Sequence, residues 1–294
     1  MATDMKKLKV AILGSGNIGT DLLVKSLRSP FLECTLFIGR HMDSPGIRKA
    51  NNLGIRISDL GIDAISKDPD SCDLVFDATS AIDHKTHWDI LDGLGKMVID
   101  MTPSGIGEMC VPAINLEDCV NHRNVNMVTC GGQASIPMAN IIGMVHPEVD
   151  RVEVVSSIAS RSAGPATRVN MDEYIEITER GLKKFSSFKR AKAILILNPA
   201  QPSIDMQTTT FAIVPKPDME RLRPMVHTMV QKIQTYVPGY HLLVGPVIEN
   251  GRIVVTIKVR GLGDYLPKYA GNLDIINCAA IATAEEYARK MTAG

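Results

Sequence analysis

The chain has 294 residues, a length typical of two domains and sufficient for a large apolar core without disulfide or metal crosslinks. Its 32 basic and 32 acidic side chains balance, which argues against a nucleic-acid partner because phosphate binding depends on clustered Lys and Arg. No run of about 18 apolar residues is present, so no membrane-spanning helix is expected. The first residues also lack the apolar run of a signal peptide, and we expect a cytoplasmic protein.

Residues 8–13 are predicted to form a buried strand, followed by a glycine-rich turn and a helix over residues 18–27. Further strands are predicted over residues 34–38, 74–78, 97–101 and 125–129, with a helix around residues 84–91. This alternation predicts a Rossmann-type α/β domain, a doubly wound parallel sheet with helices on both faces.

After about residue 150 the pattern changes to longer strands, predicted over residues 152–159, 192–197, 208–214 and 253–259. Helices are predicted over residues 172–184 and 219–236, the first starting with a capping box of Asn170 and Glu173. This half is expected to be an α+β domain with a mixed or antiparallel sheet. We place a dinucleotide-binding domain at residues 1–130 and a catalytic and dimerisation domain at residues 131–277. A last helix over residues 278–291 is expected to pack back on the first domain.

The first turn matches the G-x-G-x-x-G pattern of dinucleotide-binding proteins, with Gly14, Ser15, Gly16, Asn17, Ile18 and Gly19. Gly14 permits a tight turn, Gly16 lets the backbone approach a pyrophosphate, and Gly19 lets helix and strand pack closely. An acidic residue for the ribose 2′-hydroxyl of NAD is expected at the end of the second strand, but Arg40 stands there. Arg40 either meets a 2′-phosphate, so that NADP is accepted as well as NAD, or is a surface residue.

Six cysteines are spread over the chain without CxxC spacing, at positions 34, 72, 110, 119, 130 and 278. Five are expected in the core, as reduced thiols. Cys130 differs because it lies between an apolar strand and a helical run, at the predicted domain junction, and is followed by Gly131 and Gly132. The helix terminus is expected to lower the pKa of its thiol, and the two glycine N–H groups are expected to hold an oxyanion. Cys130 is therefore predicted to be a nucleophile.

Seven segments carry a family resemblance over nearly the whole chain: residues 14–21, 76–81, 124–134, 162–168, 197–202, 237–240 and 269–275. The cysteine segment Asn-Val-Asn-Met-Val-Thr-Cys-Gly-Gly-Gln-Ala and the last segment, Tyr-Ala-Gly-Asn-Leu-Asp-Ile, are specific together. With these motifs the chain resembles the acylating acetaldehyde dehydrogenases of aromatic-compound catabolism, which pair with a 4-hydroxy-2-oxovalerate aldolase.

The resemblance implies that acetaldehyde, or a short aliphatic aldehyde, reacts with CoA as cosubstrate and NAD to give an acyl-CoA and NADH. It implies a thiohemiacetal and then a thioester on Cys130. It also implies NAD contacts from residues 15–18 and from Ser162, Ala163, Gly164, Pro165, Ala166, Thr167, Arg168, Val169, Asn170 and Asn272. A homodimer through the second domain and a complex with the aldolase follow from the same resemblance.

The chain departs from the family pattern at several positions. Thr208 stands where the family has an Asp that is thought to assist the thiol, and a threonine cannot act as a carboxylate base. Asp205, three residues away on a strand, is expected on the opposite face. Ala166 replaces a common glycine, and the segment between Tyr240 and Arg260 is shorter. The general base, the aldehyde chain length and the CoA-binding residues therefore stay open.

Two other functions stay open. A phosphorylating semialdehyde dehydrogenase shares the two-domain plan and a catalytic cysteine, but it needs a phosphate site and a nearby histidine base. An idle NAD(P)-binding subunit of an aldolase complex would explain the missing Asp.

Several single residues allow two interpretations. Asn272 and Asp274 fit a Gly-Asn turn as well as a site, and Arg168 fits a salt bridge as well as a phosphate or carboxylate contact. Asp77 and Asp100 either line the cofactor crevice or cap helices. The seven histidines lack metal-ligand spacing, so no metal site is predicted. Their pattern assigns His84 and His87 to a solvated helix face and His227 to the core.

Overall fold

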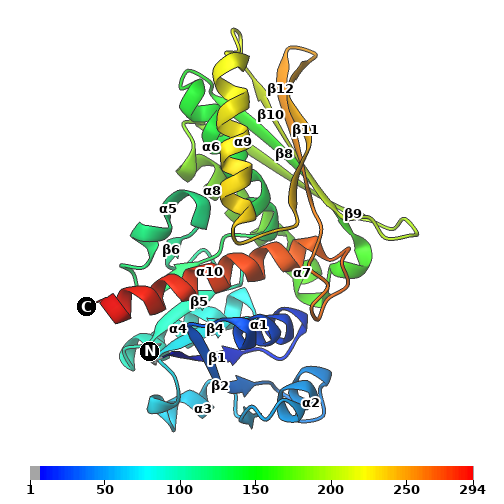
Figure 1. The fold of residues 1–294 in the computed structure, drawn as a ribbon. Coiled ribbons are helices and arrows are strands. Elements are labelled where there is room, and N and C mark those ends of the chain that lie inside the picture. Colours follow the sequence, from blue (N-terminus) through cyan, green and yellow to red (C-terminus); the bar gives the residue numbers. More distant parts are fainter. Residues whose placement is uncertain (1–6, 294) are drawn as a thin grey trace, which may run out of the picture. The chain divides into compact units, whose positions relative to one another are not determined.

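The structure, a computed structural model, describes residues 7–293, and only the backbone of Pro165, Ala166 and Ala293. The chain forms two compact units (Figure 1). Unit 1 is built from the described residues of Met1–Cys110, Asn115–Met127 and Asn277–Gly294, and unit 2 from Val111–Ile114 and Val128–Ile276. None of the helices in the described range has the length and apolarity needed to cross a bilayer.

Unit 1 contains a seven-stranded parallel sheet in the order β3-β2-β1-β4-β5-β7-β6, which confirms the predicted α/β class. Its strands are β1 (Leu8–Leu13), β2 (Leu32–Ile38), β3 (Ile57–Ser58), β4 (Leu74–Asp77), β5 (Met97–Asp100), β6 (Glu108–Met109) and β7 (Asn124–Asn126). The strand order reverses between β1 and β4. In sheets of this kind a dinucleotide binds beyond the carboxyl ends of the strands at such a reversal.

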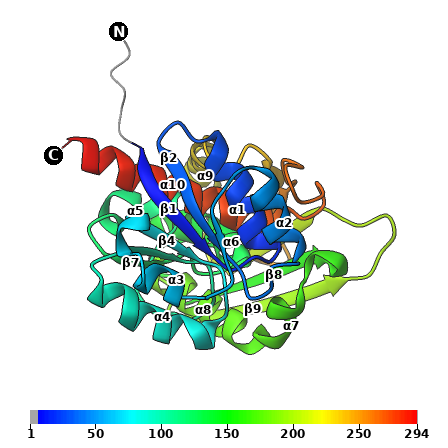
Figure 2. The same cartoon turned by 90° about the horizontal axis from the view of Figure 1, so that it is seen from below.

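Helices cover both faces of this sheet (Figure 2). They are α1 (Asn17–Arg28), α2 (Pro45–Asn52), α3 (Asp63–Ser66), the short helix η1 (Pro69–Ser71), α4 (Ala81–Gly93) and α5 (Pro112–Cys119). On one face, Ile65 of α3 and Leu91 of α4 join a buried cluster with Leu13 and Val75. On the other face, α1 approaches β1 so closely that a Cβ on Gly19 would lie 3.3 Å from the Ile12 side chain.

Unit 2 contains a five-stranded mixed sheet in the order β11-β12-β10-β8-β9, as predicted for the second half of the chain. Only β8 and β9 pair in parallel, and the other neighbours are antiparallel. The strands are β8 (Arg151–Ala159), β9 (Arg190–Asn198), β10 (Met206–Ile213), β11 (Tyr240–Glu249) and β12 (Arg252–Val259). The helices are α6 (Cys130–Val145), η2 (Ser160–Ser162), α7 (Pro165–Val169), α8 (Met171–Phe185) and α9 (Met219–Gln234).

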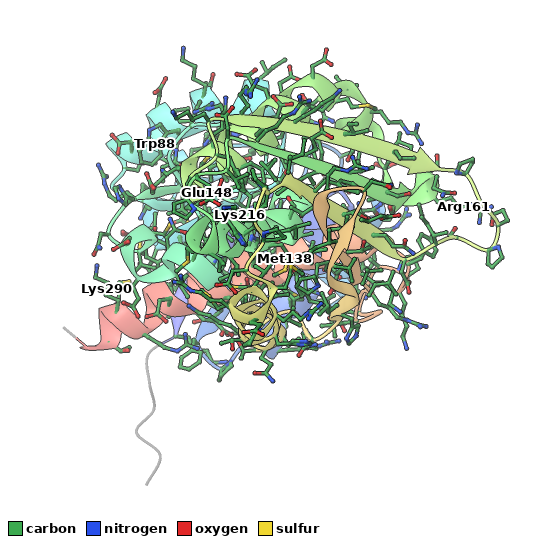
Figure 3. The ribbon with its side chains drawn as sticks, turned by 90° about the horizontal axis from the view of Figure 1, so that it is seen from above. Trp88, Met138, Glu148, Arg161, Lys216 and Lys290 are labelled. Atoms are coloured by element: carbon green, nitrogen blue, oxygen red, sulfur yellow. The ribbon has the colours of Figure 1, made fainter. Side chains whose placement is uncertain are left out.

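Helix α6 is the central helix of unit 2. Its Met138 is fully buried and lies well inside the side chains of Figure 3, whereas Arg161 lies at their periphery. Residues of β8 and β10 alternate between buried and more exposed positions, so the sheet has one inner face and one outer face. Ser156 and Thr208 belong to the inner face, which positions them toward the helices.

Three local predictions differ from the structure. The last helix, α10 (Gly271–Ala293), begins seven residues before the expected start at residue 278, so Asn272 and Asp274 lie in its first turn rather than in a Gly-Asn turn. Strand β11 was not predicted, because Gly245 and Pro246 and two register shifts interrupt its pattern. Asn170 precedes α8 without a side-chain capping hydrogen bond, so the predicted capping box is wrong.

Helix α10 continues from unit 2 into unit 1, where Asn277 fixes it to α1. The Asn277 amide donates to the Asp21 carboxylate at 2.8 Å, and Asp21 also pairs with the buried Lys25 at 3.1 Å. The C-terminal helix thus holds the helix that follows the glycine-rich turn.

Candidate active site

The turn between β1 and α1 has the backbone geometry that its glycine pattern predicts. Gly14 has a φ of +119°, and a Cβ there would lie 2.5 Å from the carbonyl oxygen of Ala78, just after β4. A Cβ on Gly19 would lie 1.8 Å from the carbonyl oxygen of Gly14, so α1 packs directly on the turn. In contrast, a Cβ on Gly16 would meet no heavy atom of the described chain within 4 Å. The space beside Gly16 is therefore open to a ligand.

The start of α1 suits an anionic ligand. The helix begins at Asn17 without a side-chain cap from Gly16 or any other described residue. Since the first N–H groups of a helix need acceptors from outside it, they attract anions such as a pyrophosphate. Ser15, in the middle of the turn, shares a 3.2 Å hydrogen bond with Ser44 at the start of α2. The residues present therefore fit a dinucleotide phosphate.

Arg40 follows β2 at the same edge of the sheet. The preceding residue, Gly39, lies against the turn, because a Cβ there would be 2.4 Å from the Ser15 hydroxyl oxygen. Arg40 itself is exposed. Arg40 therefore follows the residue that lies against the turn, and no acidic residue stands at this end of β2.

Cys130 is the first residue of α6, and a strained turn precedes it. Val128 has a φ of +60°, a conformation that is rare for a β-branched residue and costs on the order of 1–3 kcal/mol. Its side chain fits because position 181 is a glycine, where a Cβ would lie 3.0 Å from the Val128 methyl group. Thr129 then caps α6 by accepting a 2.9 Å hydrogen bond from the Gly132 N–H. Strain of this kind occurs often at active sites.

The two glycine N–H groups next to Cys130 do not have the predicted role of an oxyanion hole. The Gly131 N–H donates to the Tyr174 hydroxyl oxygen at 2.9 Å, and the Gly132 N–H donates to the Thr129 hydroxyl oxygen at 2.9 Å. The reason is that the first N–H groups of α6 lack partners within the helix, and these two hydroxyl groups supply them.

The pKa of Cys130 also differs from the prediction. The side chain is only 9% exposed, and this burial raises the pKa of its thiol instead of lowering it. Hydrogen bonds with the Tyr174 hydroxyl and the Gly131 N–H act in the opposite sense. Burial prevails because a thiolate loses its hydration in the interior, whereas the helix terminus restores only part of that stabilisation.

Tyr174 on α8 is a candidate residue that the sequence patterns did not single out. Its hydroxyl oxygen lies 3.6 Å from the Cys130 sulfur, as the acceptor of the thiol hydrogen bond. A second hydroxyl pair lies close by: Ser156 and Thr208 are 3.0 Å apart, and a Cβ on Gly131 would lie 3.0 Å from the Ser156 hydroxyl oxygen. Uncharged hydroxyl groups thus lie at Cys130 and at the neighbouring Gly131. Thr208 has no carboxylate, so position 208 does not supply the general base that the family Asp would provide.

The predicted cofactor segment of unit 2 folds as η2, a bend and α7. Arg168 donates to the carbonyl oxygens of Ala163 (3.1 Å) and Ser160 (3.0 Å) and to the Ser160 hydroxyl (2.9 Å), so it holds this bend. In the described part of the chain it forms no salt bridge, which was one of its two expected roles.

The other residues of this segment range from buried to exposed. Ser162, Ala163 and Asn170 are buried, Gly164 and Thr167 are half-buried, and Val169 is 79% exposed. The side chains of Pro165 and Ala166 lie outside the described residues.

Asn272, also in unit 2, has an unusual side chain. It is 1% exposed, and its Oδ1 has no hydrogen-bond partner among the residues that the structure describes. A buried amide oxygen without a donor is costly and needs an explanation. A ligand that brings an N–H group to this oxygen would supply one.

Asp77 and Asp100, at the carboxyl ends of β4 and β5, belong to a buried network in unit 1. Asp77 lies 2.9 Å from Nδ1 of both His84 and His87, and Nε2 of His84 lies 3.5 Å from Asp100. The assignment of both histidines to a solvated face is wrong, since the His84 side chain is fully buried and that of His87 is 14% exposed. Residues three apart share a helix face, and this face points at Asp77. Neither aspartate caps α4, because Ser80 does.

The remaining side-chain predictions have mixed outcomes. His227 is exposed, so its assignment to the core is wrong; α9 buries Leu222, Val226, Val230 and Ile233 on another face. The five cysteines other than Cys130 are buried free thiols, as predicted. Within residues 7–293, no three or more His, Cys, Asp or Glu side chains are grouped to hold a metal ion.

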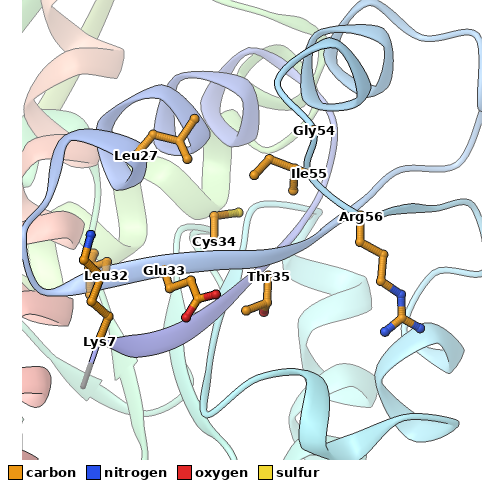
Figure 4. Close-up of a pocket in the computed structure, with 9 residues that line it drawn as sticks. All are labelled: Lys7, Leu27, Leu32, Glu33, Cys34, Thr35, Gly54, Ile55 and Arg56. Atoms are coloured by element: carbon orange, nitrogen blue, oxygen red, sulfur yellow. The ribbon is translucent and has the colours of Figure 1, made fainter. Parts of the chain in front are cut away.

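A cavity of about 460 Å³ lies at the amino end of β2 (Figure 4). Leu32, Cys34 and Thr35 of β2 line it together with Ile55 and Arg56. It lies away from the glycine-rich turn, which follows the carboxyl end of β1. Burial raises the pKa of Cys34 to about 12, so its thiol stays protonated and unreactive.

Comparison with known proteins decides the family. A family model described as prokaryotic acetaldehyde dehydrogenase, dimerisation, matches residues 130–267. An acetaldehyde dehydrogenase from Pectobacterium atrosepticum is 59% identical over 282 residues, 95% of each chain. One from Spirochaeta aurantia is 56% identical over 97% of this chain and 96% of its own length. The chain belongs to the prokaryotic acetaldehyde dehydrogenase family. The resemblance inferred from the sequence motifs is thereby confirmed.

Solved structures show how widely this acetaldehyde dehydrogenase fold is shared. Aspartate semialdehyde dehydrogenase II from Vibrio cholerae has a TM-score of 0.64 at 13% identity, covering 97% of this chain and 99% of its own. Aspartate semialdehyde dehydrogenase with NADP from Candida albicans has a TM-score of 0.61 at 11% identity, covering 95% and 100%. At such low identity these likenesses show the fold alone. The fold is therefore shared with semialdehyde dehydrogenases, the class considered above as an alternative function. The high sequence identities of this chain are to acetaldehyde dehydrogenases.

Proposed function

We propose that the chain oxidises acetaldehyde, or a short aliphatic aldehyde, to an acyl-CoA, with NAD as hydride acceptor and Cys130 as nucleophile. Membership of the acetaldehyde dehydrogenase family supports the reaction. The observation that carries the assignment of the nucleophile is the position of Cys130, the first residue of α6 after the strained Val128, with its sulfur 3.6 Å from the Tyr174 hydroxyl oxygen. The other five cysteines lack this setting.

Cys130 acts as a thiolate on the aldehyde carbonyl carbon. A C–S bond forms while the carbonyl π electrons move to oxygen, which gives the alkoxide of a thiohemiacetal. The amino end of α6 favours negative charge at the sulfur. A bound nicotinamide would supply the hydride acceptor. Loss of hydride from the thiohemiacetal carbon, as the alkoxide oxygen re-forms a carbonyl group, leaves a thioester on Cys130. The thiol of CoA then attacks the thioester, takes the acyl group and returns Cys130 to its starting state.

Two regions support nicotinamide cofactor binding. In unit 1, the open space beside Gly16 and the uncapped start of α1 fit the pyrophosphate, and the exposed Arg40 supports acceptance of NADP beside NAD. In unit 2, the predicted contacts are residues 162–170 and Asn272. The Asn272 Oδ1, which lacks a donor in the described chain, suits an amide N–H such as that of a nicotinamide carboxamide.

The outer face of the unit 2 sheet supports a homodimer. It exposes Ile194 and Ile196 on one edge strand, β9, and Val244 and Val247 on the other, β11, at 37–44% of their surface. The matching family model over residues 130–267 carries the word dimerisation in its description. We therefore propose that two copies pair through this face. A complex with a 4-hydroxy-2-oxovalerate aldolase and a role in aromatic-compound catabolism rest on the family resemblance alone.

Intact and peptide mass after mixing the protein with NAD and acetaldehyde, without CoA, tests the proposed reaction. One acetyl group is expected on the Cys130 peptide, and added CoA should remove it. Cys130→Ala should gain no acetyl group, whereas the matched variant Cys34→Ala should be acetylated like the wild type. Absence of an acetyl group on Cys130 in the wild-type protein would overturn the mechanism and favour an idle NAD(P)-binding subunit.

A further inference from the structure

Tyr174 reaches Cys130 because position 131 is a glycine. A Cβ on Gly131 would lie 2.2 Å from the Tyr174 hydroxyl oxygen, so any other residue there would displace the ring. The hydroxyl oxygen accepts the Gly131 N–H at 2.9 Å and lies 3.6 Å from the Cys130 sulfur. Tyr174 is itself 7% exposed, so its ring is fixed by packing.

The directions of the hydrogen bonds around the Tyr174 hydroxyl leave its own proton available to the Cys130 sulfur. A phenol hydroxyl has one proton to donate and oxygen lone pairs that accept. The Gly131 N–H occupies the oxygen as an acceptor, and the thiol S–H points at the same oxygen. Once the thiol has lost its proton, the hydroxyl group, whose oxygen lies 3.6 Å from the sulfur, can turn its own proton toward it, beside the Gly131 and Cys130 N–H groups that also face the sulfur. Burial holds the pKa of Tyr174 well above its ordinary value, so this proton is present throughout the range in which a thiol ionises.

The groups that lower the pKa of Cys130 carry no charge. They are the Tyr174 hydroxyl, followed by the backbone N–H groups of Gly131 and Cys130. From the sheet side, Ser156 of β8 and Thr208 of β10 are neutral and hydrogen-bond to each other. With Thr208 in place of the family Asp, the thiolate is stabilised by these uncharged donors alone, the Tyr174 hydroxyl first among them.

We propose that Tyr174 is a catalytic residue of this chain: its hydroxyl donates a hydrogen bond to the Cys130 thiolate and so favours ionisation of the thiol without a carboxylate base at position 208. This inference rests on the proposed role of Cys130 as nucleophile. No proton leaves Tyr174 in this step. The proton of the Cys130 thiol goes to water, and the hydroxyl group turns from acceptor to donor. Hydrogen bonds to an ionised group are stronger than those to a neutral one, so the thiolate gains more than the thiol.

The test is the pH profile of Cys130 alkylation by iodoacetamide, followed on the Cys130 peptide by mass spectrometry. It needs neither cofactor nor aldehyde. In Tyr174→Phe the midpoint is expected to rise by about one pH unit, and kcat/KM for acetaldehyde at neutral pH to fall about tenfold. The matched control is Tyr240→Phe, which also removes a buried hydroxyl from unit 2, one that donates to the Ala134 carbonyl at 2.8 Å. It should leave the midpoint unchanged.

A second variant keeps the shape of the side chain. Fluorotyrosine at position 174 has a more acidic hydroxyl and donates a stronger hydrogen bond, so the alkylation midpoint should fall. A merely structural ring would leave the midpoint unmoved. An unchanged midpoint in both Tyr174 variants would overturn this inference. If the wild type is still acetylated at Cys130, that result leaves the proposed function intact.

Discussion

Two carboxylates and two imidazoles lie together in the interior of unit 1. Burial acts to raise the pKa of Asp77, but hydrogen bonds from His84 and His87 outweigh it and hold that pKa well below its usual range. Burial raises the pKa of Asp100 to about 6. Burial acts to lower the pKa of His84, yet the two aspartates raise it overall. The network is therefore most stable with Asp77 ionised and His84 protonated.

Each of these pKa shifts changes the stability of the folded chain over its own pH range. The lowered pKa of Asp77 adds stability above its unfolded value, near 3.8, which is lost as the pH falls through the folded pKa. The raised pKa of His84 adds stability below its unfolded value, near 6.5, which is lost as the pH rises through the folded pKa. The raised pKa of Asp100 acts in the same sense as that of His84: its contribution is complete below 3.8 and is lost as the pH rises through about 6.

Asp77→Asn should lower the free energy of unfolding at pH 7 by about 3 kcal/mol, because it removes the buried carboxylate that both His84 and His87 contact. It should also remove much of the loss of stability that the wild type shows on acidification below pH 4. Urea unfolding at pH 7 and at lower pH measures both effects. The exposed Asp59→Asn is the control and should change stability by less than about 0.5 kcal/mol. Equal stability of Asp77→Asn and wild type would contradict the network.

At the scale of elements, Gly16 and Gly19 of the glycine-rich turn have different roles. A Cβ on Gly19 would collide with the Gly14 carbonyl at 1.8 Å, whereas a Cβ on Gly16 would project into open space. Gly19 therefore sets how α1 packs on β1, and Gly16 keeps room for a ligand.

Gly19→Ala should lower the free energy of unfolding by about 2 kcal/mol or more, the usual cost of overpacking. Gly16→Ala should leave stability within about 0.5 kcal/mol of wild type and weaken NAD binding, since its methyl group occupies the proposed pyrophosphate space. Urea unfolding and titration calorimetry with NAD separate the two effects. Wild-type NAD affinity in Gly16→Ala would argue against this turn as the cofactor site.

At the scale of the whole molecule, the outer face of the unit 2 sheet is the proposed contact between two copies. Ile194 and Ile196 of β9 lie on it opposite Val155 and Ser157 of β8. Beside them, the Thr209 and Thr256 hydroxyls of β10 and β12 are 3.0 Å apart and satisfy each other. These two hydroxyls therefore need no partner from outside the sheet when a second copy covers the face.

The double variant Ile194→Glu, Ile196→Glu should be a monomer, because two copies would bury unpaired carboxylates at their contact. The wild type is expected to be a dimer by analytical ultracentrifugation at micromolar concentration. Ile82→Glu is the control: Ile82 is 82% exposed on α4 of unit 1 and outside the proposed contact, so this variant should remain a dimer. A wild-type monomer, or a dimeric double variant, would contradict the proposal.

The sequence by itself determined the alternation of strands and helices, the glycine turn, the place of Cys130 at a helix start and, through its motifs, the family. These are local patterns, in which neighbouring residues dictate backbone shape. It missed β11 and the true start of α10, because Gly245 and Pro246 break the strand pattern and Gly271 and Asn272 resemble a turn.

Only the tertiary structure decided which groups surround the thiol and which charges are buried. Tyr174 meets Cys130 from 44 positions away, and no local pattern records that contact. The same packing buries His84 and supplies hydroxyl partners to the Gly131 and Gly132 N–H groups. It also raises the pKa of Cys130, against the local expectation from the helix terminus. Burial and partner choice depend on how distant elements pack, which the spacing of residues along a chain does not fix.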